Sequence, residues 1–330
     1  MGKVVVHYVN CNKICEKTAM NQRTIKTAIA VTGTGLHSGQ PVDLEFHPQP
    51  VDTGIVFERS DIVGSEPIPA SAFLVQDTMM SSNLVFGGTR VGTVEHLLSA
   101  IAGLGVDNLL IRVSASEIPI MDGSAAPFVA LLLDAGFCEQ DALKKFIKIV
   151  RPVRVKVDDK WAELRPYDGF ELNFEIDFDH PAIDRNFQHA QLQFSTQNFI
   201  EQLSEARTFG FLRDIEQLRQ NNLALGGSME NAIVIDDANI LNEEGLRFND
   251  EFVRHKILDA LGDLYLIGYP IVGRFNAYKS GHALNNLLVR EILSDKNNFE
   301  IVTFDDNVTC PIEYSPLNGL AVEGLSLIHI

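Results

Sequence analysis

The sequence predicts an α+β fold built from two similar halves that join near residues 138–145. Three observations support this prediction. At 330 residues, the chain is long enough for about two domains of the usual ~150 residues. Short runs that alternate apolar and polar residues, typical of half-buried strands, are followed in each half by helical segments. The second half repeats the element order of the first, and that order alone is the basis for expecting two similar units.

The first half begins with a strand expected over residues 24–32, which ends at a glycine-rich turn over residues 33–39. Residues 42–46 alternate apolar and acidic side chains, the two-residue period of a half-buried strand. Thr93 is expected to cap a helix whose apolar residues share one face. Further strands are expected at residues 54–59 and 108–113, and a further helix at residues 125–135.

The second half is expected to open with strands and to end in alternating helices and strands. Its strands are expected at residues 146–157, 161–165, 172–178, 232–235 and 273–278, and its helices at residues 251–267 and after residue 282. The expected domains are residues 20–142 and 143–318. Neither the leader at residues 1–19 nor the tail at residues 319–330 has the pattern of these domains, and we expect both to lie outside the native fold.

The composition argues against polyanionic partners. The formal charge is 27 − 44 = −17, so we expect no binding to nucleic acid or to an anionic membrane surface. No apolar run reaches the ~18–20 residues that a membrane span needs, since the longest candidate, residues 258–268, contains Asp263. The first residues carry no secretory cleavage signature, so we expect a cytoplasmic protein without stable membrane insertion.

The four cysteines are scattered and too few for a disulfide framework in a chain of this length, so reduced thiols are expected. Cys11 and Cys15 have a spacing that could hold a metal ion. No second pair lies near them in the sequence, however, so we interpret them as incidental thiols in a polar leader.

One expected helix carries a stripe of metal-binding residue types. His255, Asp259 and Asp263 are spaced four apart, so they lie on one face of the helix at residues 251–267. Imidazole and carboxylate groups are zinc ligands, and this spacing lets two side chains reach one ion. Taken alone, a His and an Asp four residues apart are more often an ordinary pair on a helix surface.

Two further segments carry residue types for acid–base chemistry. Glu95 and His96 begin an apolar helix, and a His ligand beside a Glu is how metallohydrolases combine metal binding with a general base. His282 follows an expected strand and opens an expected helix, a place where side chains commonly face a cleft. Histidine titrates near neutral pH and can protonate a leaving amine. Each of these features alone also fits an ordinary surface position.

Six segments stand out in order along the chain. They are residues 33–39 (GTGLHSG), 93–97 (TVEHL), 117–124 (EIPIMDGS), 206–210 (ARTFG), 255–259 (HKILD) and 277–282 (AYKSGH). Together they resemble the UDP-3-O-acyl-N-acetylglucosamine deacetylase family of lipid A biosynthesis, and the resemblance covers residues 20–316. It implies two similar two-layer α/β sandwich domains packed face to face. Each domain would carry a small insert, here near residues 60–90 and 208–236.

The resemblance also implies a catalytic zinc ion (Zn2+). Its ligands would be His96, His255 and Asp259. Three protein ligands leave a coordination position open for water, whereas a closed structural zinc site takes four. This expectation therefore favours a catalytic site over a structural one.

Five further residues take catalytic roles by the same resemblance. Glu95 would accept a proton from the water that attacks the acetamide carbonyl. His282 would protonate the departing glucosamine nitrogen, and Asp263 would orient His282 and keep it cationic. Lys256 and Thr208 would stabilise the oxyanion. The products would be UDP-3-O-acyl-glucosamine and acetate.

The implied partner is a UDP-sugar substrate that carries an acyl chain. We expect the protein to be a monomer. In this family the two inserts frame a hydrophobic passage for that chain. The residues that would line it here are Met79, Phe209, Phe211, Ala224, Ser228 and Val234. Phe178 would stack on the base, and Lys160 and Lys279 would lie near the diphosphate.

Two other interpretations stay open from the residues alone. The chain could be a sugar-nucleotide or acyl-chain binding protein that has the fold without turnover, although Glu95 and His282 are intact. It could also be an acidic interaction scaffold whose His and Asp residues form a structural site or surface pairs. Metal analysis, together with the turnover of the parent, separates these interpretations from a zinc hydrolase.

Overall fold

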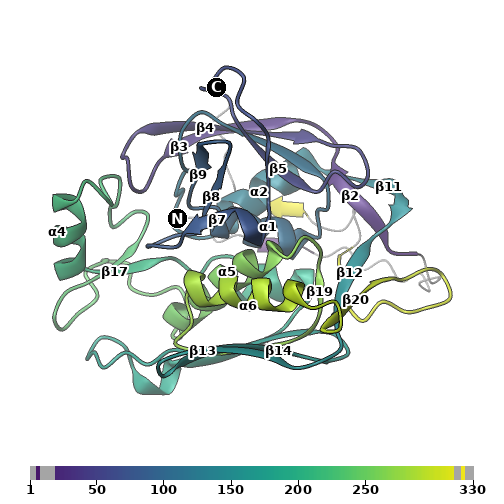
Figure 1. Ribbon diagram of the computed structural model, residues 1–330. Coiled ribbons are helices and arrows are strands. Elements are labelled where there is room, and N and C mark those ends of the chain that lie inside the picture. The colour runs from purple at the N-terminus through teal and green to yellow at the C-terminus, as the bar shows by residue number, and fades with distance from the viewer. Residues whose placement is uncertain (1–4, 8–18, 316–320, 324–330) are drawn as a thin grey trace.

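The computed structural model describes residues 5–7, 19–315 and 321–323 of the chain, with side chains described over residues 19–315. Six α-helices and several sheets lie within these residues, so the fold is mixed α and β, in agreement with the predicted class. The expected leader at residues 1–19 and tail at residues 319–330 fall mostly outside the described residues. Two large sheets form outer layers, and helices lie between them (Figure 1).

The first large sheet has five strands in the order β3-β4-β10-β5-β6. In that order they span Ile29–Thr34, Pro41–Pro48, Leu109–Val113, Ile55–Arg59 and Ile68–Pro69. β10 runs antiparallel to β4 and parallel to β5. Val42, Leu44 and Phe46 of β4 are fully buried, as their alternation with polar residues predicts. Helices α1 (Glu95–Leu104) and α2 (Ala126–Ala135) lie on the inner side of this sheet.

The second large sheet has seven strands. They are β13 (Val153–Val157), β14 (Lys160–Arg165), β19 (Ile271–Tyr278), β12 (Lys145–Ile149), β20 (Phe299–Thr303), β15 (Phe170–Glu175) and β16 (His189–Gln193). The central strand β19 pairs with β14 on one side and with β12 and β15 on the other. Helices α5 (Glu251–Tyr265) and α6 (His282–Ser294) cover its inner side.

Helices α1 and α5 pack against each other at the centre of the molecule, so the helices of the two sheets share one continuous apolar core. Leu97, Leu98 and Ile101 of α1 and Leu258 and Leu261 of α5 are almost fully buried in it. This interface places the first turn of α1 beside the middle of α5. Among the described residues, no helix has the length and apolar character needed to span a membrane.

Smaller sheets lie outside the two large sheets in the strand pairing. β7 (Val75–Asp77), β8 (Asn83–Phe86) and β9 (Thr89–Val91) form a three-stranded sheet after a short 3-10 helix, Ala72–Leu74. β17 (Phe209–Phe211) pairs in parallel with β18 (Ile233–Ile235), and α4 (Leu212–Gln220) lies in the connection. The remaining pairs are β2 (Asn21–Ile25) with β11 (Phe137–Leu143) and β1 (Val5–His7) with β21 (Ala321–Glu323), and α3 spans Thr196–Gln202.

Two of the expected strands are each two strands, so those predictions are wrong. The run at residues 24–32 is divided between β2 and β3, because the chain leaves its partner β11 and joins its new partner β4. The run at residues 146–157 is divided between β12 and β13 around Pro152, where proline has no N–H to continue a ladder. The other expected strands and helices are present, with ends that differ by a few residues.

The predicted cap of α1 is also wrong. Val94, not Thr93, precedes the first helical residue, and no side chain caps this end. Thr93 has a φ of +56°, in the left-handed region that β-branched residues rarely adopt, and its buried hydroxyl has no hydrogen-bond partner. The entry into α1 is therefore strained, and strain of this kind persists only where the surrounding structure enforces it.

Candidate metal centre and active site

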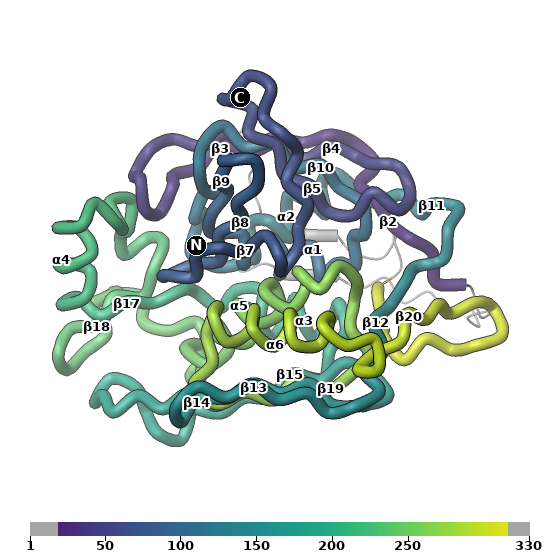
Figure 2. Tube along the Cα trace, viewed as in Figure 1, coloured from purple at the N-terminus to yellow at the C-terminus, as the bar shows by residue number. Residues whose placement is uncertain are grey.

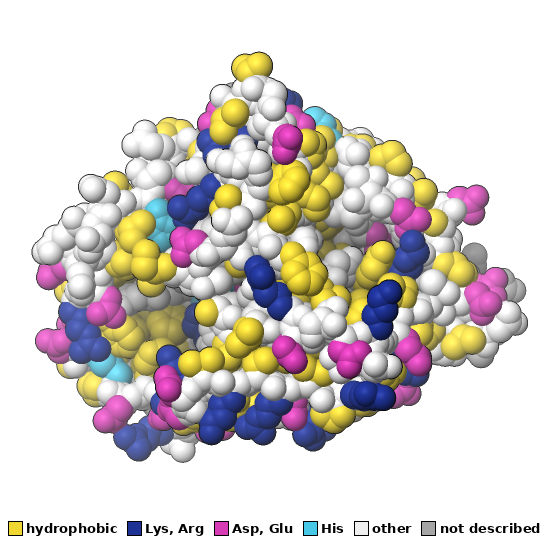
Figure 3. All heavy atoms as spheres, viewed as in Figure 1, with side chains coloured by type: hydrophobic (Ala, Val, Ile, Leu, Met, Phe, Trp, Pro, Cys, Tyr) yellow, Lys and Arg dark blue, Asp and Glu magenta, His cyan; other side chains and the backbone are white. Residues whose placement is uncertain are grey.

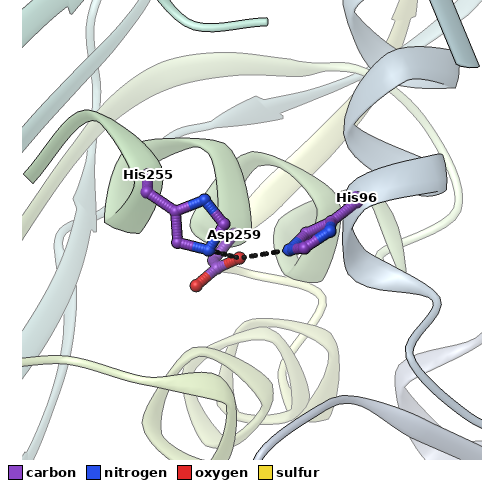
Figure 4. Close-up of side chains that lie close together, drawn as sticks. All are labelled: His96, His255 and Asp259. Atoms are coloured by element: carbon purple, nitrogen blue, oxygen red, sulfur yellow. Dashed lines mark ion pairs between the residues drawn. The ribbon is translucent and has the colours of Figure 1, made fainter. Parts of the chain in front are cut away.

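Three buried side chains from two helices meet in the interior (Figure 4). His96 comes from the first turn of α1, and His255 and Asp259 come from neighbouring turns of α5. The Oδ1 atom of Asp259 lies 3.4 Å from Nε2 of His96 and 3.3 Å from Nε2 of His255. One ligand atom of each residue lies within 4.8 Å of the others, so this group can hold a metal ion.

The chemistry of the three donors fits a metal such as zinc. Oδ1 of Asp259 is buried without a hydrogen-bond partner, which is costly for a carboxylate oxygen. Burial lowers the pKa of His255 to about 3, so its imidazole is neutral. Nδ1 of His255 donates to the carbonyl oxygen of Ala206 at 3.1 Å, which leaves the lone pair on Nε2, facing Asp259. Neutral imidazole and ionised carboxylate are ligands that zinc accepts.

The two helices bring these residues together because they approach closely at Gly262. A Cβ atom at this position would lie 2.0 Å from the carbonyl oxygen of Glu95, so any larger residue would push α1 away from α5. His255, Asp259 and Asp263 are all buried on α5, at intervals of four residues. The stripe predicted from their spacing therefore faces the interior and not solvent.

Lys256 holds the second oxygen of Asp259. Its ammonium group donates to Oδ2 at 2.8 Å. Burial alone would raise the pKa of the Asp259 carboxyl, but the cationic charge around it holds the pKa well below its usual range. His255 and then Lys256 are the main groups that lower this pKa, and Asp259 in turn raises the pKa of Lys256 against the effect of burial. Asp259 is thus ionised, with Oδ2 held by Lys256 and with Oδ1 facing the two imidazoles without a hydrogen-bond partner.

Glu95 lies beside His96 on α1 and is 2% exposed. Its Oε2 accepts a hydrogen bond from the backbone N–H of Ser82 at 3.0 Å, and its Oε1 lies 3.8 Å from Nε2 of His282. Burial raises the pKa of Glu95, against the opposing effects of His282 and His96. A carboxyl group that is anchored through one oxygen and has a raised pKa is suited to exchange a proton through the other.

His282 and Asp263 form a buried pair next to Glu95. Nδ1 of His282 lies 2.9 Å from Oδ2 of Asp263, and Asn285 donates to the same oxygen at 2.9 Å. The hydroxyl of Ser82 donates to Oδ1 of Asp263 at 2.6 Å. Burial alone would lower the pKa of His282, but Asp263 and Glu95 raise it to about 10. His282 is therefore a cation at neutral pH, with a proton on the Nε2 atom that faces Glu95.

A buried ion pair fixes the segment behind His255. Arg207 is 2% exposed and Glu251 is fully buried. Arg207 donates to Oε1 of Glu251 from Nε at 2.9 Å and from its backbone N–H at 3.0 Å. These bonds tie the start of α5 to the chain next to Ala206, whose carbonyl holds His255. The ion pair between Arg207 and Glu251 thus helps to orient the imidazole of His255 indirectly, through the Ala206 carbonyl.

A family model described as UDP-3-O-acyl N-acetylglycosamine deacetylase matches residues 22–294. The chain belongs to this family. A Psychrobacter cryohalolentis protein named UDP-3-O-acyl-N-acetylglucosamine deacetylase is 92% identical over 320 residues, which are 97% of this chain and 100% of that protein. An Acinetobacter baumannii protein of the same name is 59% identical over 295 residues, 89% of this chain and 98% of the relative. One from Thioalkalivibrio sulfidiphilus is 57% identical over 297 residues, 90% and 98% of the two chains.

Family membership makes the chain a deacetylase, and it confirms the resemblance seen in the six sequence segments. Of the two residues expected to stabilise an oxyanion, Lys256 contacts Asp259 directly. Thr208 lies just before β17 and uses its backbone, donating to the carbonyl of Gly123 and accepting from Ile233, both at 2.8 Å. Thr208 is two residues after Ala206, whose carbonyl oxygen accepts from His255, so this short segment links Thr208 to the candidate metal group.

Three phenylalanines of this deacetylase gather beside the metal-binding group. The ring of Phe178 lies 5.7 Å from that of Phe209 and 5.8 Å from that of Phe211, and the ring of Phe209 lies 6.3 Å from the imidazole of His255. Figure 3 shows a hollow with hydrophobic side chains on its floor, next to the position of β17 in Figure 1. The residue expected to stack on a base thus packs against two residues expected to line the passage.

The other four residues expected in the passage differ in exposure. Ala224 and Val234 are buried in the segment between β17 and β18 and in β18 itself. Ser228 is exposed, and Met79 is 64% exposed. Met79 lies between β7 and β8, in the segment expected to form the first insert. The two segments expected as inserts thus contribute both buried and solvent-exposed candidates.

The two lysines expected near a diphosphate have different surroundings. Lys279 donates to Asp159 at 2.8 Å and lies 3.3 Å from an oxygen of Asp177. Its φ is +54°, and it lies three residues before His282, the first residue of α6. Thr93, which also has a positive φ, similarly lies two residues before Glu95, the first residue of α1. Lys160 is exposed at the start of β14. A diphosphate at Lys279 would compete with the two aspartates.

Five components of the site were not predicted from the sequence: Ser82, Asn285, Gly262, Arg207 and the Ala206 carbonyl. Asn285 carries a local signal, because it follows His282 by three residues and shares its helix face. Gly262 carries another, since a glycine inside a helix often marks a close approach. Ser82 carries none, because it reaches both Glu95 and Asp263 only through the tertiary fold.

Proposed function

We propose that this protein hydrolyses the acetamide of UDP-3-O-acyl-N-acetylglucosamine, with zinc as its cofactor, in the committed deacetylation of lipid A biosynthesis. One observation carries the proposal: a buried carboxylate oxygen of Asp259 without a partner faces two imidazoles, beside the buried pair of Glu95 and His282. The relatives named above bear the name of this activity. Metal ligands, a base and an acid are the groups that amide hydrolysis requires.

His96, His255 and Asp259 would hold the zinc ion. When bound, the ion supplies Lewis acidity, which makes water acidic enough to act as a nucleophile near neutral pH and polarises a carbonyl group. Lys256 donates to Oδ2 of Asp259, which would leave Oδ1 of this carboxylate available to the ion. The Ala206 carbonyl keeps the ring of His255 in the required orientation.

Glu95 is the proposed general base. The attacking water forms a bond to the acetamide carbon and gives its proton to Oε1, the oxygen that the Ser82 N–H does not hold. A pKa raised by burial makes Glu95 a better proton acceptor than an exposed carboxylate. Lys256 and Thr208 would stabilise the negative charge that develops on the carbonyl oxygen.

His282 is the proposed general acid. When the carbon–nitrogen bond breaks, Nε2 gives its proton to the departing amine, and acetate and UDP-3-O-acyl-glucosamine are released. Asp263 fixes Nδ1 and keeps the ring cationic, and Ser82 and Asn285 hold Asp263 in turn. The same charge that makes His282 a cation thus orients its proton towards the reaction.

For the substrate, the phenylalanine cluster supports an acyl passage between the two inserts. We assign Met79, Phe209, Phe211, Ala224, Ser228 and Val234 to its walls. Phe178 would stack on the base, with Lys160 and Lys279 near the diphosphate. We expect the enzyme to act as a monomer in the cytoplasm, without nucleic acid and without stable insertion into a membrane.

Removal and return of the metal test this proposal. The purified protein is expected to carry about one zinc ion per chain and to release acetate from UDP-3-O-acyl-N-acetylglucosamine. Chelation should abolish the release, and added zinc should restore it. A metal-free protein with full activity would overturn the zinc assignment, and a zinc-loaded protein that binds the substrate without turnover would make it a binding protein.

A further inference from the structure

Two of the six sequence segments that carry the family resemblance, residues 33–39 and 117–124, meet outside the candidate metal centre. Glu117 is 5% exposed, and its carboxylate lies inside the glycine-rich turn between β3 and β4. Its Oε2 accepts the backbone N–H of His37 at 3.0 Å, and its Oε1 accepts that of Ser38 at 2.8 Å. A buried carboxylate thus organises the turn through two charge-assisted hydrogen bonds.

The opposite side of the same turn binds the insert of the second half. The carbonyl of Leu36 accepts the N–H of Gly226 at 3.0 Å, and the carbonyl of His37 accepts the N–H of Leu225 at 3.2 Å. Figure 2 shows the β3–β4 turn beside the segment that follows α4. Segments nearly two hundred residues apart in sequence are therefore joined by backbone hydrogen bonds.

These contacts run through shared peptide groups. The carbonyl of Leu36 and the N–H of His37 belong to one peptide group, and the carbonyl of His37 and the N–H of Ser38 belong to the next. Each group donates to Glu117 and accepts from the insert. Because hydrogen bonds in a chain polarise one another, the charge on Glu117 strengthens the bonds to Gly226 and Leu225.

Glycines make this approach possible. A Cβ atom on Gly35 would lie 2.3 Å from Oε1 of Glu117, and one on Gly226 would lie 2.2 Å from the carbonyl oxygen of Gly35. Gly39 has a φ of +67°, and its Cβ would lie 3.3 Å from the backbone nitrogen of Gly226. The turn and the insert therefore touch backbone to backbone, and a side chain at Gly35 or Gly226 would separate them.

The anchored segment belongs to the proposed acyl passage. Gly226 lies between Ala224 and Ser228, two residues assigned to its walls, and Ala224 has a strained φ of +53°. Five residues further along the insert, the carbonyl of Asn231 packs against Gly123 of the second segment. α4 precedes both attachments and is an exposed helix without a buried residue. The insert thus depends on the first half for its position.

We propose that Glu117 is a positioning residue for acyl-chain selection. Through the turn at residues 33–39 it anchors the wall of the passage formed by residues 224–228, so the passage keeps the width and depth that the acyl chain requires. This inference rests on the proposed function for its effect on substrate. The anchor itself, Glu117 to the turn to the insert, stands on the hydrogen bonds alone.

Two variants break the anchor from opposite sides. In Glu117→Gln, the amide keeps one acceptor but sets an NH2 group against a backbone N–H. In Gly226→Ala, the new Cβ meets the Gly35 carbonyl. Glu230→Gln is the matched control, since it removes the same charge from an exposed site in the same insert. All three are compared with the parent for zinc content, and for kcat and KM on substrates with long and short acyl chains.

Both anchor variants are expected to raise the KM for the long-chain substrate about tenfold, the size expected when a hydrogen bond to a charged group is lost. Their kcat, their KM for the short-chain substrate and their zinc content should match the parent, as should every value of Glu230→Gln. An unchanged dependence on chain length would overturn the proposal. So would an equal loss on both substrates, because that is the result of a purely structural role.

Hydrogen exchange tests the anchor without any substrate. In Glu117→Gln the amides of Leu225 and Gly226 should exchange about tenfold faster than in the parent and in Glu230→Gln, while amides of α5 keep their protection. Unchanged exchange at these two amides would refute the anchor. If the parent released no acetate while exchange responded as expected, the proposed function would fail and the anchor would stand.

Discussion

Helices α1 and α5 both carry residues of the candidate site, but they present them in different ways. α5 offers His255, Asp259 and Asp263 from its middle, along one stripe at intervals of four. α1 offers Glu95 and His96 from its first turn, where neighbours in sequence point about 100° apart. His96 therefore faces Asp259 while Glu95 lies near His282, so one turn serves two tasks.

The difference shows what holds each set of residues in place. The α5 stripe is held by helical hydrogen bonds before and after it, so its internal geometry follows from the helix itself. The first turn of α1 has no side-chain cap and follows a strained Thr93. Its position depends on the contact with Gly262 and on the Ser82 N–H, which are tertiary contacts. The two helices should therefore respond differently to substitution.

The two tasks of the α1 turn should separate in adjacent variants. Glu95→Gln removes the proposed base but no ligand, so turnover should fall by about 10²–10⁴ while zinc content stays at the parental level. His96→Ala removes a ligand, so zinc content and activity should fall together. Acetate release and metal analysis on the same preparations measure both. Loss of zinc from Glu95→Gln would contradict the assignment of metal binding to His96 and of proton transfer to Glu95.

At the start of α5, removal of Arg207 should cost stability. Arg207→Met leaves Glu251 buried without its cationic partner, so the free energy of unfolding should fall by about 3–5 kcal/mol. Arg185→Met is the control, because Arg185 is 81% exposed in its ion pair with Asp179 and such pairs contribute little. Denaturant unfolding measures both. Equal stability of the two variants would show that the buried pair does not hold α5.

The close contact between the helices should matter for activity as well as for stability. Gly262→Ala forces α1 and α5 apart, and overpacking of this kind costs about 1–3 kcal/mol. Gly103→Ala adds the same methyl group to α1 at its far end, where the Cβ would lie 2.2 Å from the ring of Phe199. Both variants should unfold more easily, but turnover per folded, zinc-loaded molecule should fall only in Gly262→Ala. Equal turnover in both would contradict a positioning role for the contact.

The pairing of Asp263 on α5 with His282 should appear in the pH dependence of stability. The pKa of His282 is raised to about 10 from its ordinary value of 6.5, so the folded state holds a proton that the unfolded state releases. Its stabilisation is complete below about pH 6.5 and is lost as pH rises towards 10. In zinc-free protein the unfolding free energy should fall by at most about 1.4 kcal/mol per pH unit, the slope for one proton.

His282→Gln is the comparison for this measurement. It should flatten the decline between pH 7 and 10, and Asp263→Asn should move the decline to lower pH, since the carboxylate that raises the pKa of His282 is gone. Denaturant titrations across this range give the slopes. A parental slope in both variants would show that another group holds the proton.

Much of the fold could be predicted from local patterns. The α+β class, the strand at β4 and the helix at α5 are present because alternation and helical period are properties of neighbouring residues. The prediction of one strand over residues 24–32 was wrong where the chain changes partners, an event that apolar patterning does not record. The prediction over residues 146–157 was wrong because it overlooked Pro152. The prediction of Thr93 as the cap was wrong, because the helix begins one residue later and Thr93 adopts a left-handed φ in place of a capping conformation.

For the candidate site, the resemblance and the residue types led to His96, His255 and Asp259, and these three meet in the structure. The contacts that tune them were not predicted. Ser82 and the Ala206 carbonyl act through a backbone N–H, a hydroxyl and a carbonyl that nearly any segment of a chain could offer. Nothing in the local sequence distinguishes them.

By itself, the sequence determined the stripe at residues 255, 259 and 263, because four-residue spacing on a helix is a local property. The tertiary structure alone decided that His96 faces this stripe, that Ser82 joins Glu95 to Asp263, and that Glu117 reaches the second insert through a glycine-rich turn. Each of these contacts joins segments far apart in the chain. They depend on how closely two backbones can approach, and here glycines permit the close approach because they have no Cβ atom.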